Sequence, residues 1–461
     1  MIKHIAIEIN PNLNRGEVLF YTNDKDLFQI VHRKRNYTLQ MGNKRVTSVS
    51  IYCGSTSKKV ERMQVSLETA QVLKIPLHKL TLQMRISEEK KSIQIGPVIG
   101  IFVRQKKKQK TITKLQKQIV QQYLLHAKEL HYYAFAFCAE DIEWTKKMIQ
   151  GYILDENDKI IKRTVPFPDV MYDQNVSRTY EQQANVIKAM ERLRQEIPFY
   201  FNPGYFNKWE IFEYISNHEQ AKKYHPPTIL LKSVSDIAAN VIKHGFVYLK
   251  PINGSQGKGI ITITRKNQHY EYKSQGSMLV EGRSLNKKQL EESVSNIIKR
   301  RQYILQKGLS LIRYNGRPVD IRVLMQKNEH GKWVRTKMFA RVSKPGSITS
   351  NLSTGGEAKT VEEVLAVNFP PATVNTIVAN LRRAARVITH ALEEKSEKLF
   401  GELGLDLGIT ENGQTWLIEV NSKPWKTLDT ETGSKELVEK SFRRPIEYAG
   451  YLVNAGKLKE V

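Results

Sequence analysis

The segment 403-LGLDLGITENGQTWLIEVNSKP-424 constrains the fold more than any other stretch of the chain. Its Asn412-Gly413 pair is a strong signal for a two-residue hairpin turn of type I′. With this turn, pairing runs outward in register and Ile409 faces Trp416. The segment is therefore predicted to form two antiparallel strands whose side chains alternate between two faces.

Two carboxylates meet on one face of this predicted hairpin. Further from the turn Leu407 faces Ile418, and at the next position Asp406 lies directly opposite Glu419. Alternation places Asn421 on the face of Glu419. Like charges directly opposed on a sheet are destabilising, whereas two carboxylates and an amide are oxygen ligands that suit Mg²⁺. The alternatives are an exposed, tolerated pair or a different register, but the flanking apolar residues favour the metal.

A second segment, 248-YLKPINGSQGKGIITIT-264, places glycines and two lysines between strand-like runs. It fails the Walker A pattern because Lys258 is followed by Gly259. It fails the dinucleotide fingerprint because a strand, and not a helix, follows the glycines. The loop should therefore join two strands as a flap whose backbone N–H groups could cover a polyphosphate, with Lys250 within reach of a phosphate. An ordinary glycine-rich hairpin is the alternative.

A third segment, 317-RPVDIRVLMQ-326, places Asp320 and Arg322 on one face of a strand and an apolar set on the other. The next strand, 336-TKMFARV-342, is predicted to form a hairpin with it and supplies Arg341. Two arginines in one cleft suit a transferring phosphoryl group or a carboxylate. Taken singly, each arginine is more often a surface ion-pair partner.

The chain divides into three predicted domains. Residues 1–94 are rich in short alternating segments, which predict a β-rich domain with one helix around 66–74. Residues 95–200 alternate strands with helices and predict a small α/β unit. Residues 201–461 carry the chemistry on helices and strand pairs. The basic tract 104–114 could contact polyanions, although a solvated loop is the commoner meaning of so short a run.

Charge and cysteine content narrow the class of protein. The formal net charge of +27 would attract anionic partners or simply keep the surface soluble. No nucleic-acid-binding module is recognisable, so nucleic acid is not expected as a partner. Cys53 and Cys138 form no ligand pattern, which argues against a disulfide framework or a zinc site. The N-terminus lacks the apolar core of a signal peptide and no run is long enough to span a bilayer, so we expect a cytoplasmic protein.

These segments, in this order, resemble the ATP-grasp superfamily over about residues 200–430. Over the whole chain the sequence is similar to the YheC/YheD family of endospore coat-associated proteins from spore-forming bacteria. The resemblance implies an α/β ATP-grasp fold, preceded by a small α/β domain and an N-terminal β-rich domain. It also implies ATP and Mg²⁺ as cofactors.

The resemblance assigns roles to individual residues, in three groups. The expected nucleotide-binding residues, which comprise two lysines, the flap and an adenine-binding hinge, are Lys208, Lys250, Gly254, Ser255, Gly257, Gln306, Lys307 and Gly308. The expected catalytic residues are Asp320, Arg322 and Arg341. The expected Mg²⁺ ligands are Asp406, Glu419 and Asn421, and Asn351 is expected in the loop on the substrate side.

The resemblance further implies a carboxylate–amine ligase that works through an acyl phosphate, with small carboxylate and amine substrates that the sequence does not identify. The loop 351-NLSTGG-356 lacks the basic residue that related ligases often carry between the Asn and the glycines, so the acceptor stays open. The alternative is a non-catalytic spore-coat component that keeps the fold. In a spore former the chain would act in the mother cell or the spore coat, with coat proteins or polyanions as further partners.

Overall fold

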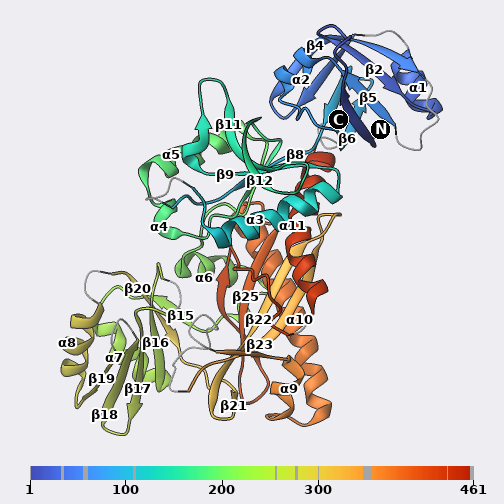
Figure 1. The fold of residues 1–461 in the computed structure, drawn as a ribbon. Helices are drawn as coiled ribbons and strands as arrows, with labels where there is room; N and C mark the ends of the chain where they lie inside the picture. Colours follow the sequence, from blue (N-terminus) through green and yellow to red (C-terminus); the bar gives the residue numbers. More distant parts are fainter. Residues whose placement is uncertain are drawn as a thin grey trace.

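The computed structural model describes residues 2–32, 36–54, 61–106, 111–254, 257–275, 279–298, 301–345, 356–432 and 434–456. Within them the chain forms four β-sheets, arranged from the N-terminal barrel, through a middle sheet, to two C-terminal sheets (Figure 1). None of the helices in these ranges is both long and apolar enough to cross a membrane.

The N-terminal part is a closed barrel with the strand order β1-β5-β2-β4-β3-β7-β6. The apolar residues of its alternating segments fill the interior, as the pattern predicts, and closure removes the free sheet edges. The second helix lies where the sequence predicts one, whereas the first was not predicted. The elements are β1 (Ile2–Ile9), β2 (Glu17–Tyr21), α1 (Lys25–His32), β3 (Tyr37–Met41), β4 (Lys44–Gly54), β5 (Arg62–Val65), α2 (Leu67–Leu73), β6 (Leu80–Ser87) and β7 (Ser92–Ile95).

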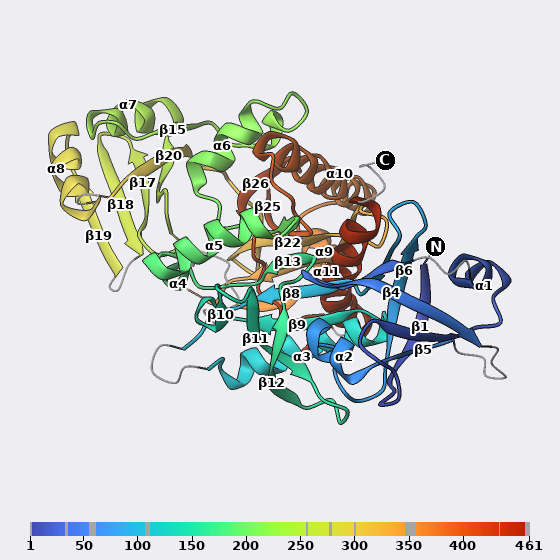
Figure 2. The same cartoon turned by 90° about the horizontal axis from the view of Figure 1, so that it is seen from above.

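The middle sheet lies between the barrel and the C-terminal sheets (Figure 2). Its strand order is β10-β11-β9-β8-β13-β14, and β12 pairs with β11. Strands β9, β8, β13 and β14 run parallel, as expected for an α/β unit. The elements are β8 (Val98–Phe102), α3 (Lys114–Glu129), β9 (Tyr133–Phe137), η1 (Ala139–Asp141), β10 (Ile142–Glu143), β11 (Met148–Leu154), β12 (Ile160–Pro166), β13 (Val170–Asp173), α4 (Arg178–Glu181), α5 (Ala184–Glu196) and β14 (Phe199–Phe201).

The third sheet has the order β15-β20-β16-β17-β18-β19 and packs against helices α7 and α8. The glycine-rich loop joins β16 to its antiparallel neighbour β17, so the predicted strand-to-strand setting is confirmed. The elements are α6 (Lys208–Ser216), η2 (Lys222–Tyr224), β15 (Thr228–Leu230), α7 (Ser235–His244), β16 (Phe246–Pro251), β17 (Ile260–Lys266), β18 (His269–Gln275), β19 (Leu279–Ser284), α8 (Lys287–Ile298) and β20 (Tyr303–Lys307).

The fourth sheet has the order β24-β23-β22-β25-β26, with β21 paired to β22. The long helix α10 covers its apolar face, where the predicted apolar side chains of β22 are buried. The elements are β21 (Arg313–Tyr314), β22 (Arg317–Lys327), β23 (Trp333–Val342), β24 (Glu357–Lys359), α9 (Val361–Ala366), α10 (Pro371–Ser396), β25 (Glu402–Ile409), β26 (Thr415–Asn421) and α11 (Lys435–Gly456).

The turn of the β25–β26 hairpin is wider than predicted. Ile409 pairs with Thr415 and not with Trp416. The N–H of Thr410 donates to the Gln414 carbonyl (3.0 Å), so residues 410–414 form the connection. A type I′ turn needs positive φ at both central residues, but only the glycine of the Asn-Gly pair has it, at +81°. The predicted type I′ turn is therefore wrong.

A β-bulge restores the predicted register beyond the turn. Leu407 pairs with Leu417, and the register then shifts so that Asp406 pairs with Glu419. Ile418 is the extra residue on β26, and it compensates for the residue that the wider turn takes up. The predicted opposition of the two carboxylates is thus confirmed, although the pairing of Leu407 with Ile418 is not.

Asn202 joins the start of β25 to the end of β26. Its Oδ1 accepts hydrogen bonds from the N–H groups of Gly401 (2.8 Å) and Glu402 (3.2 Å), and its Nδ2 donates to the carbonyls of Glu402 and Ser422. Its side chain is fully buried and its φ is +57°, a conformation that Asn tolerates better than most residues. This one side chain therefore fixes the strands that carry both carboxylates.

We predict that Asn202→Ala lowers the free energy of unfolding by about 2–4 kcal/mol, because it leaves several buried backbone groups without partners. Urea denaturation measures the change. Asn185→Ala, at an exposed position on α5, is the control and should change stability by less than about 0.5 kcal/mol. Equal stabilities of the two variants would contradict this role for Asn202.

Candidate active site

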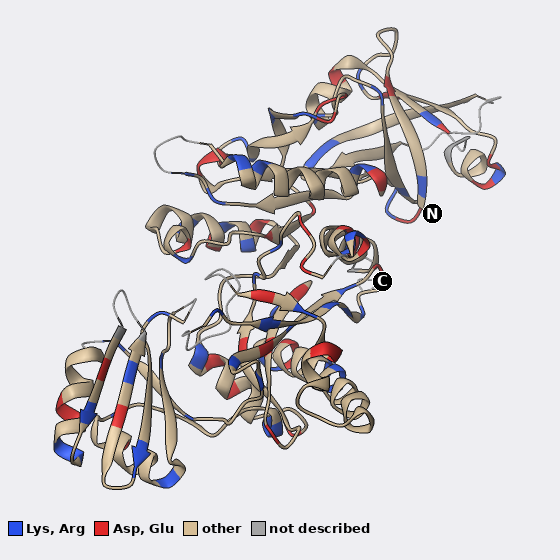
Figure 3. Cartoon of the chain, turned by 60° about the horizontal axis from the view of Figure 1, so that its bottom comes forward, with Lys and Arg blue, Asp and Glu red and all other residues tan. Residues whose placement is uncertain are grey.

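A cleft of about 1500 Å³ lies between the third and fourth sheets and reaches residues 176–179, just after β13. Pockets for one small molecule measure about 300–1,000 Å³, so this cleft has room for more than one ligand. Lys and Arg are spread over every part of the fold (Figure 3). In the described lining of the cleft they outnumber Asp and Glu by twelve to five, which suits anionic ligands.

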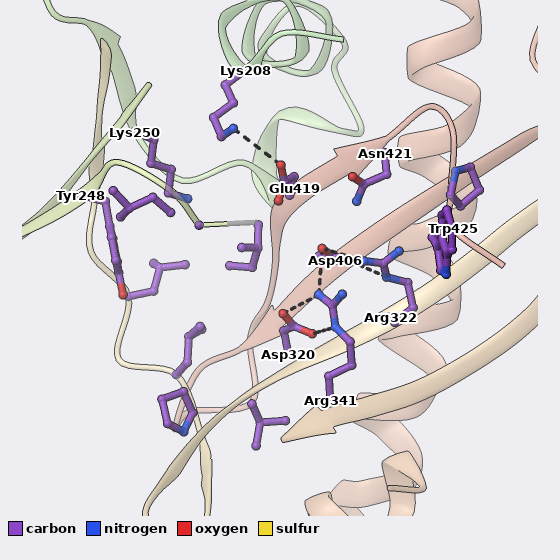
Figure 4. A pocket seen from close by; sticks show the side chains of 18 of the residues that line it. Lys208, Tyr248, Lys250, Asp320, Arg322, Arg341, Asp406, Glu419, Asn421 and Trp425 are labelled. Atoms are coloured by element: carbon purple, nitrogen blue, oxygen red, sulfur yellow. Dashed lines mark hydrogen bonds and ion pairs between the residues drawn. The ribbon is translucent and has the colours of Figure 1, made fainter. Parts of the chain in front are cut away.

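Four neighbouring strands of the fourth sheet bring the predicted acidic and basic residues onto one face of the sheet. Asp406 on β25 pairs in register with Glu419 on β26 and with Arg322 on β22. Asp320 on β22 pairs with Arg341 on β23. All five residues line the cleft, as Figure 4 shows.

The Asp406 carboxylate lies between two guanidinium groups. Its Oδ1 is 2.7 Å from Arg322 Nε, and its Oδ2 is 2.8 Å from an Arg341 guanidinium nitrogen. Arg341 also makes two hydrogen bonds to Asp320, of 2.6 and 2.7 Å. Burial works against the charge of Arg341, but the carboxylates of Asp406 and Asp320 outweigh it and raise its pKa. These cations neutralise the carboxylate that the sequence predicts to need a metal.

The donor set fits Mg²⁺ without forming an all-carboxylate cage. No group of three His, Cys, Asp or Glu side chains arranged to hold a metal occurs among the described residues. Glu419 is 32% exposed, and Asn421 lies on the same face two residues further along β26. Mg²⁺ is commonly held by one or two carboxylates together with substrate phosphates. Asp406, Glu419 and Asn421 therefore supply the donors that such a site needs.

Lys208 faces these carboxylates from the first turn of α6. Asn207 caps that helix by accepting a hydrogen bond from the Glu210 N–H (2.8 Å), so Lys208 is its first residue. The Lys208 ammonium lies 3.6 Å from Glu419 Oε1 and donates to the carbonyl of Gly254 in the flap (3.0 Å). It thus connects the flap with a candidate metal ligand.

Lys250 is buried in the same wall of the cleft. Its ammonium donates to Gln306 Oε1 (2.7 Å), and Gln306 in turn donates to Thr228 Oγ1 (3.0 Å). Burial, followed by the nearby charge of Lys208, lowers the pKa of Lys250 from 10.5 to about 8. A phosphate beside this ammonium would favour its charged form.

The backbone N–H groups of the predicted hinge, those of Lys307 and Gly308, donate hydrogen bonds to other backbone groups of the protein. The N–H of Lys307 donates to the Pro227 carbonyl (2.9 Å), and that of Gly308 donates to the Phe246 carbonyl (2.8 Å). Pro227 has no N–H, so it cannot donate a hydrogen bond to the carbonyl of Lys307 in return. The Lys307 carbonyl is therefore the hinge group that is left as an acceptor by its pairing with Pro227. Gly308 is not in the cleft lining. A Cβ there would lie 2.0 Å from the Phe246 ring, so packing explains this glycine.

The other predicted site residues divide into three groups. Gln306, Lys307 and Gly257 line the cleft, and Gly257 has a φ of +71°, which favours glycine. Gly254 meets Lys208 through its carbonyl but is not in the lining. Ser255 and Asn351 lie outside the described residues.

Sequence reasoning missed the segment that follows β26. Lys423, Trp425 and Lys426 line the cleft, and both lysines are buried in ion pairs with residues far away in the sequence. Their place directly after the Glu419–Asn421 strand was the only available signal. The position of these lysines after β26 did not indicate which carboxylates they pair with.

Comparisons with known proteins show the family to which the chain belongs. The family described as "YheC/D like ATP-grasp" matches residues 197–452. The endospore coat-associated protein YheD of Bacillus subtilis (strain 168) is 30% identical over 375 residues, which cover 78% of this chain and 80% of that protein. The endospore coat-associated protein YheC of the same organism is 25% identical over 303 residues, covering 64% and 80%.

Among solved structures, that of the D-cycloserine synthetase DcsG is 13% identical with a TM-score of 0.46, covering 77% of this chain and 99% of that one. The match of the family over more than half of the chain and the identity to YheD decide the assignment. The chain belongs to the YheC/YheD-like ATP-grasp family.

Proposed function

We propose that the protein is an ATP-dependent ligase that joins a carboxylate to an amine, with Mg²⁺ as its cofactor. The observation that carries the proposal is the placement of Asp406, Glu419 and Asn421 across the cleft from Lys208 and Lys250 (Figure 4). Oxygen ligands and ammonium groups that line the same cleft suit a metal-bound polyphosphate. Membership of an ATP-grasp family supports the same conclusion.

Each wall has a separate task in this proposal. Glu419, Asn421 and Asp406 would hold Mg²⁺, which when bound neutralises phosphate charge and orients the transferring group. Lys208 and Lys250 bind the phosphate oxygens of ATP. The flap between β16 and β17 covers them and excludes water.

The reaction needs no covalent bond to the protein. A carboxylate oxygen of the first substrate attacks the γ-phosphorus of ATP, and the bond from that phosphorus to the β–γ bridging oxygen breaks, giving an acyl phosphate and ADP. The lone pair of an amine attacks the acyl carbon, inorganic phosphate leaves, and the amine proton passes to solvent. Arg322 and Arg341 line the cleft beside Asp406 and stabilise the negative charge that develops.

We also propose that the protein associates with the endospore coat, because the names of both relatives record that association for them. A non-catalytic coat component with the same fold is the competing proposal. It would bind Mg-ATP without releasing ADP in the presence of any carboxylate and amine. Turnover therefore separates the two.

We predict that Glu419→Gln weakens Mg²⁺-dependent ATP binding by at least about tenfold and abolishes ADP release, because it removes a charged oxygen ligand. Calorimetry measures the binding, and a coupled assay with pooled amino acids and small carboxylic acids measures the release. Glu436→Gln, on the exposed surface of α11, is the matched control and should behave as wild type. ATP binding without substrate-dependent ADP release in the wild type would overturn the ligase and favour the coat component.

We predict that the affinity for Mg-ATP falls as pH rises above 8. Lys250 has a pKa lowered to about 8, so its ammonium loses its proton as pH passes this value, and binding must then restore the proton. Linkage gives a loss of about fivefold between pH 8 and pH 9. Calorimetry in buffers with different ionisation enthalpies also measures the proton uptake.

Two variants check the assignment of this pH dependence. Lys250→Met should bind more weakly and with no change of affinity between pH 8 and pH 9. Lys188→Met, at an exposed position on α5, should keep the wild-type profile. An unchanged pH profile in Lys250→Met would exclude Lys250 as the titrating group.

A further inference from the structure

Trp425 is an exposed aromatic side chain beside the candidate metal ligands. Of the described residues that line the cleft, it alone is a large apolar side chain with substantial exposure, at 54%. It lies four residues after Asn421, and Figure 4 shows its ring near Asn421 and Arg322. An indole in this position loses water when a ligand covers it.

A buried lysine, Lys423, anchors the chain two residues before Trp425. The Lys423 ammonium lies 2.7 Å from Asp173 Oδ1 and 3.1 Å from Glu181 Oε2, and the side chains of Lys423 and Asp173 have no exposure. Asp173 ends β13 of the middle sheet. Because a buried ammonium is costly without a partner, this contact holds the segment firmly against the middle sheet.

A second buried lysine fixes the other side. The Lys426 ammonium lies 2.6 Å from Glu402 Oε2 and donates to the hydroxyls of Tyr123 (2.8 Å) and Tyr172 (3.1 Å). Trp425 is therefore held between two anchored neighbours. A rigid segment that presents an exposed indole loses little freedom when a ligand binds, which favours binding.

Apolar side chains line the same cleft as this indole. Leu324 and Phe339 line the cleft from β22 and β23. Pro424 packs over Gly404 of β25, where an added Cβ would lie 3.1 Å from Pro424 Cβ. We call Leu324, Phe339, Pro424 and Trp425 the apolar wall.

Charged groups lie next to the apolar wall. Lys337 pairs in register with Leu324, and its ammonium lies 2.9 Å from Glu431 Oε2. Both charged residues line the cleft. Such a pair offers one charge to the carboxylate and the other to the ammonium of an amino acid.

We propose that the apolar wall is the side-chain subsite of the second substrate, and that this substrate is an amino acid or short peptide with an aromatic side chain. This inference rests on the proposed ligase function, because it assigns the amine side of that reaction. Ring stacking on Trp425 supplies the preference for aromatic side chains. The cleft is larger than a pocket for one small molecule, so it can hold this second substrate beside ATP.

Calorimetric titration of four free amino acids tests the proposal in the presence of Mg²⁺ and a non-hydrolysable ATP analogue. The probes are phenylalanine, alanine, lysine and glutamate. We expect phenylalanine to bind the wild type about tenfold more tightly than alanine. Trp425→Ala should remove this preference, and Trp425→Phe should restore most of it. Leu285→Ala, at an exposed apolar position on the third-sheet side of the molecule, is the control and should bind as wild type.

The outcomes separate this inference from the proposed function. Binding of phenylalanine no tighter than alanine, survival of the preference in Trp425→Ala, preferential binding of lysine or glutamate, or binding of none of the four overturns the inference. If ADP release still depends on Glu419 in any of these cases, the ligase function stands and only the substrate class is wrong. If the ATP analogue does not bind but phenylalanine does so through Trp425, the ligase function fails and the aromatic subsite stands.

Discussion

The buried ion pair between Lys426 and Glu402 joins the two ends of the β25–β26 hairpin and connects them to the middle sheet. Glu402 begins β25, and it accepts hydrogen bonds from Tyr172 of the middle sheet and from Gln326 of β22. Lys426 lies in the segment after β26 and also contacts Tyr123 on α3. A charge buried without a partner costs several kcal/mol. Moving either residue out of the contact would leave the other charge buried and unpaired, so the pair holds both segments in place. The middle sheet, the β25–β26 hairpin and the Trp425 segment are therefore fixed as one unit.

Charge neutralisation explains how the cleft is stable with two opposed carboxylates. Asp406 and Glu419 face each other in register, an arrangement that costs stability on an ordinary sheet. Arg322 and Arg341 hold Asp406, and Lys208 lies near Glu419. The two carboxylates are thus held in place by cations of the protein itself. The opposed carboxylates do not by themselves require a cation, so the metal assignment depends on the whole donor set and the lysines across the cleft.

The β25–β26 hairpin shows how far pattern reasoning reaches. Alternation and the Asn-Gly pair predicted two strands with Asp406 opposite Glu419, which the structure confirms. The turn type and the bulge at Ile418 were not predicted, and the two deviations cancel because each shifts the register by one residue. The strand β22 and its partner β23 were also predicted from the alternation of side chains along β22, whereas the register shift between Leu324 and Met325 was not. Gly308 shows where pattern reasoning fails. Only glycine fits there because a Cβ would collide with the ring of Phe246, which lies sixty-two positions earlier in the chain.

The sequence by itself determined the strands, their faces and the residue types that meet in the cleft, because these depend on periodicity and on neighbours in the chain. The tertiary structure alone decided which cations neutralise Asp406, how deeply Lys250 is buried and that Trp425 stands exposed between two buried lysines. The exposure of Trp425, for example, depends on Asp173 of the middle sheet and on Glu402 at the start of β25, which pair with the lysines on either side of it. Local pattern carries no record of such long-range contacts, so the cleft's electrostatics and its substrate side become visible only in the folded chain.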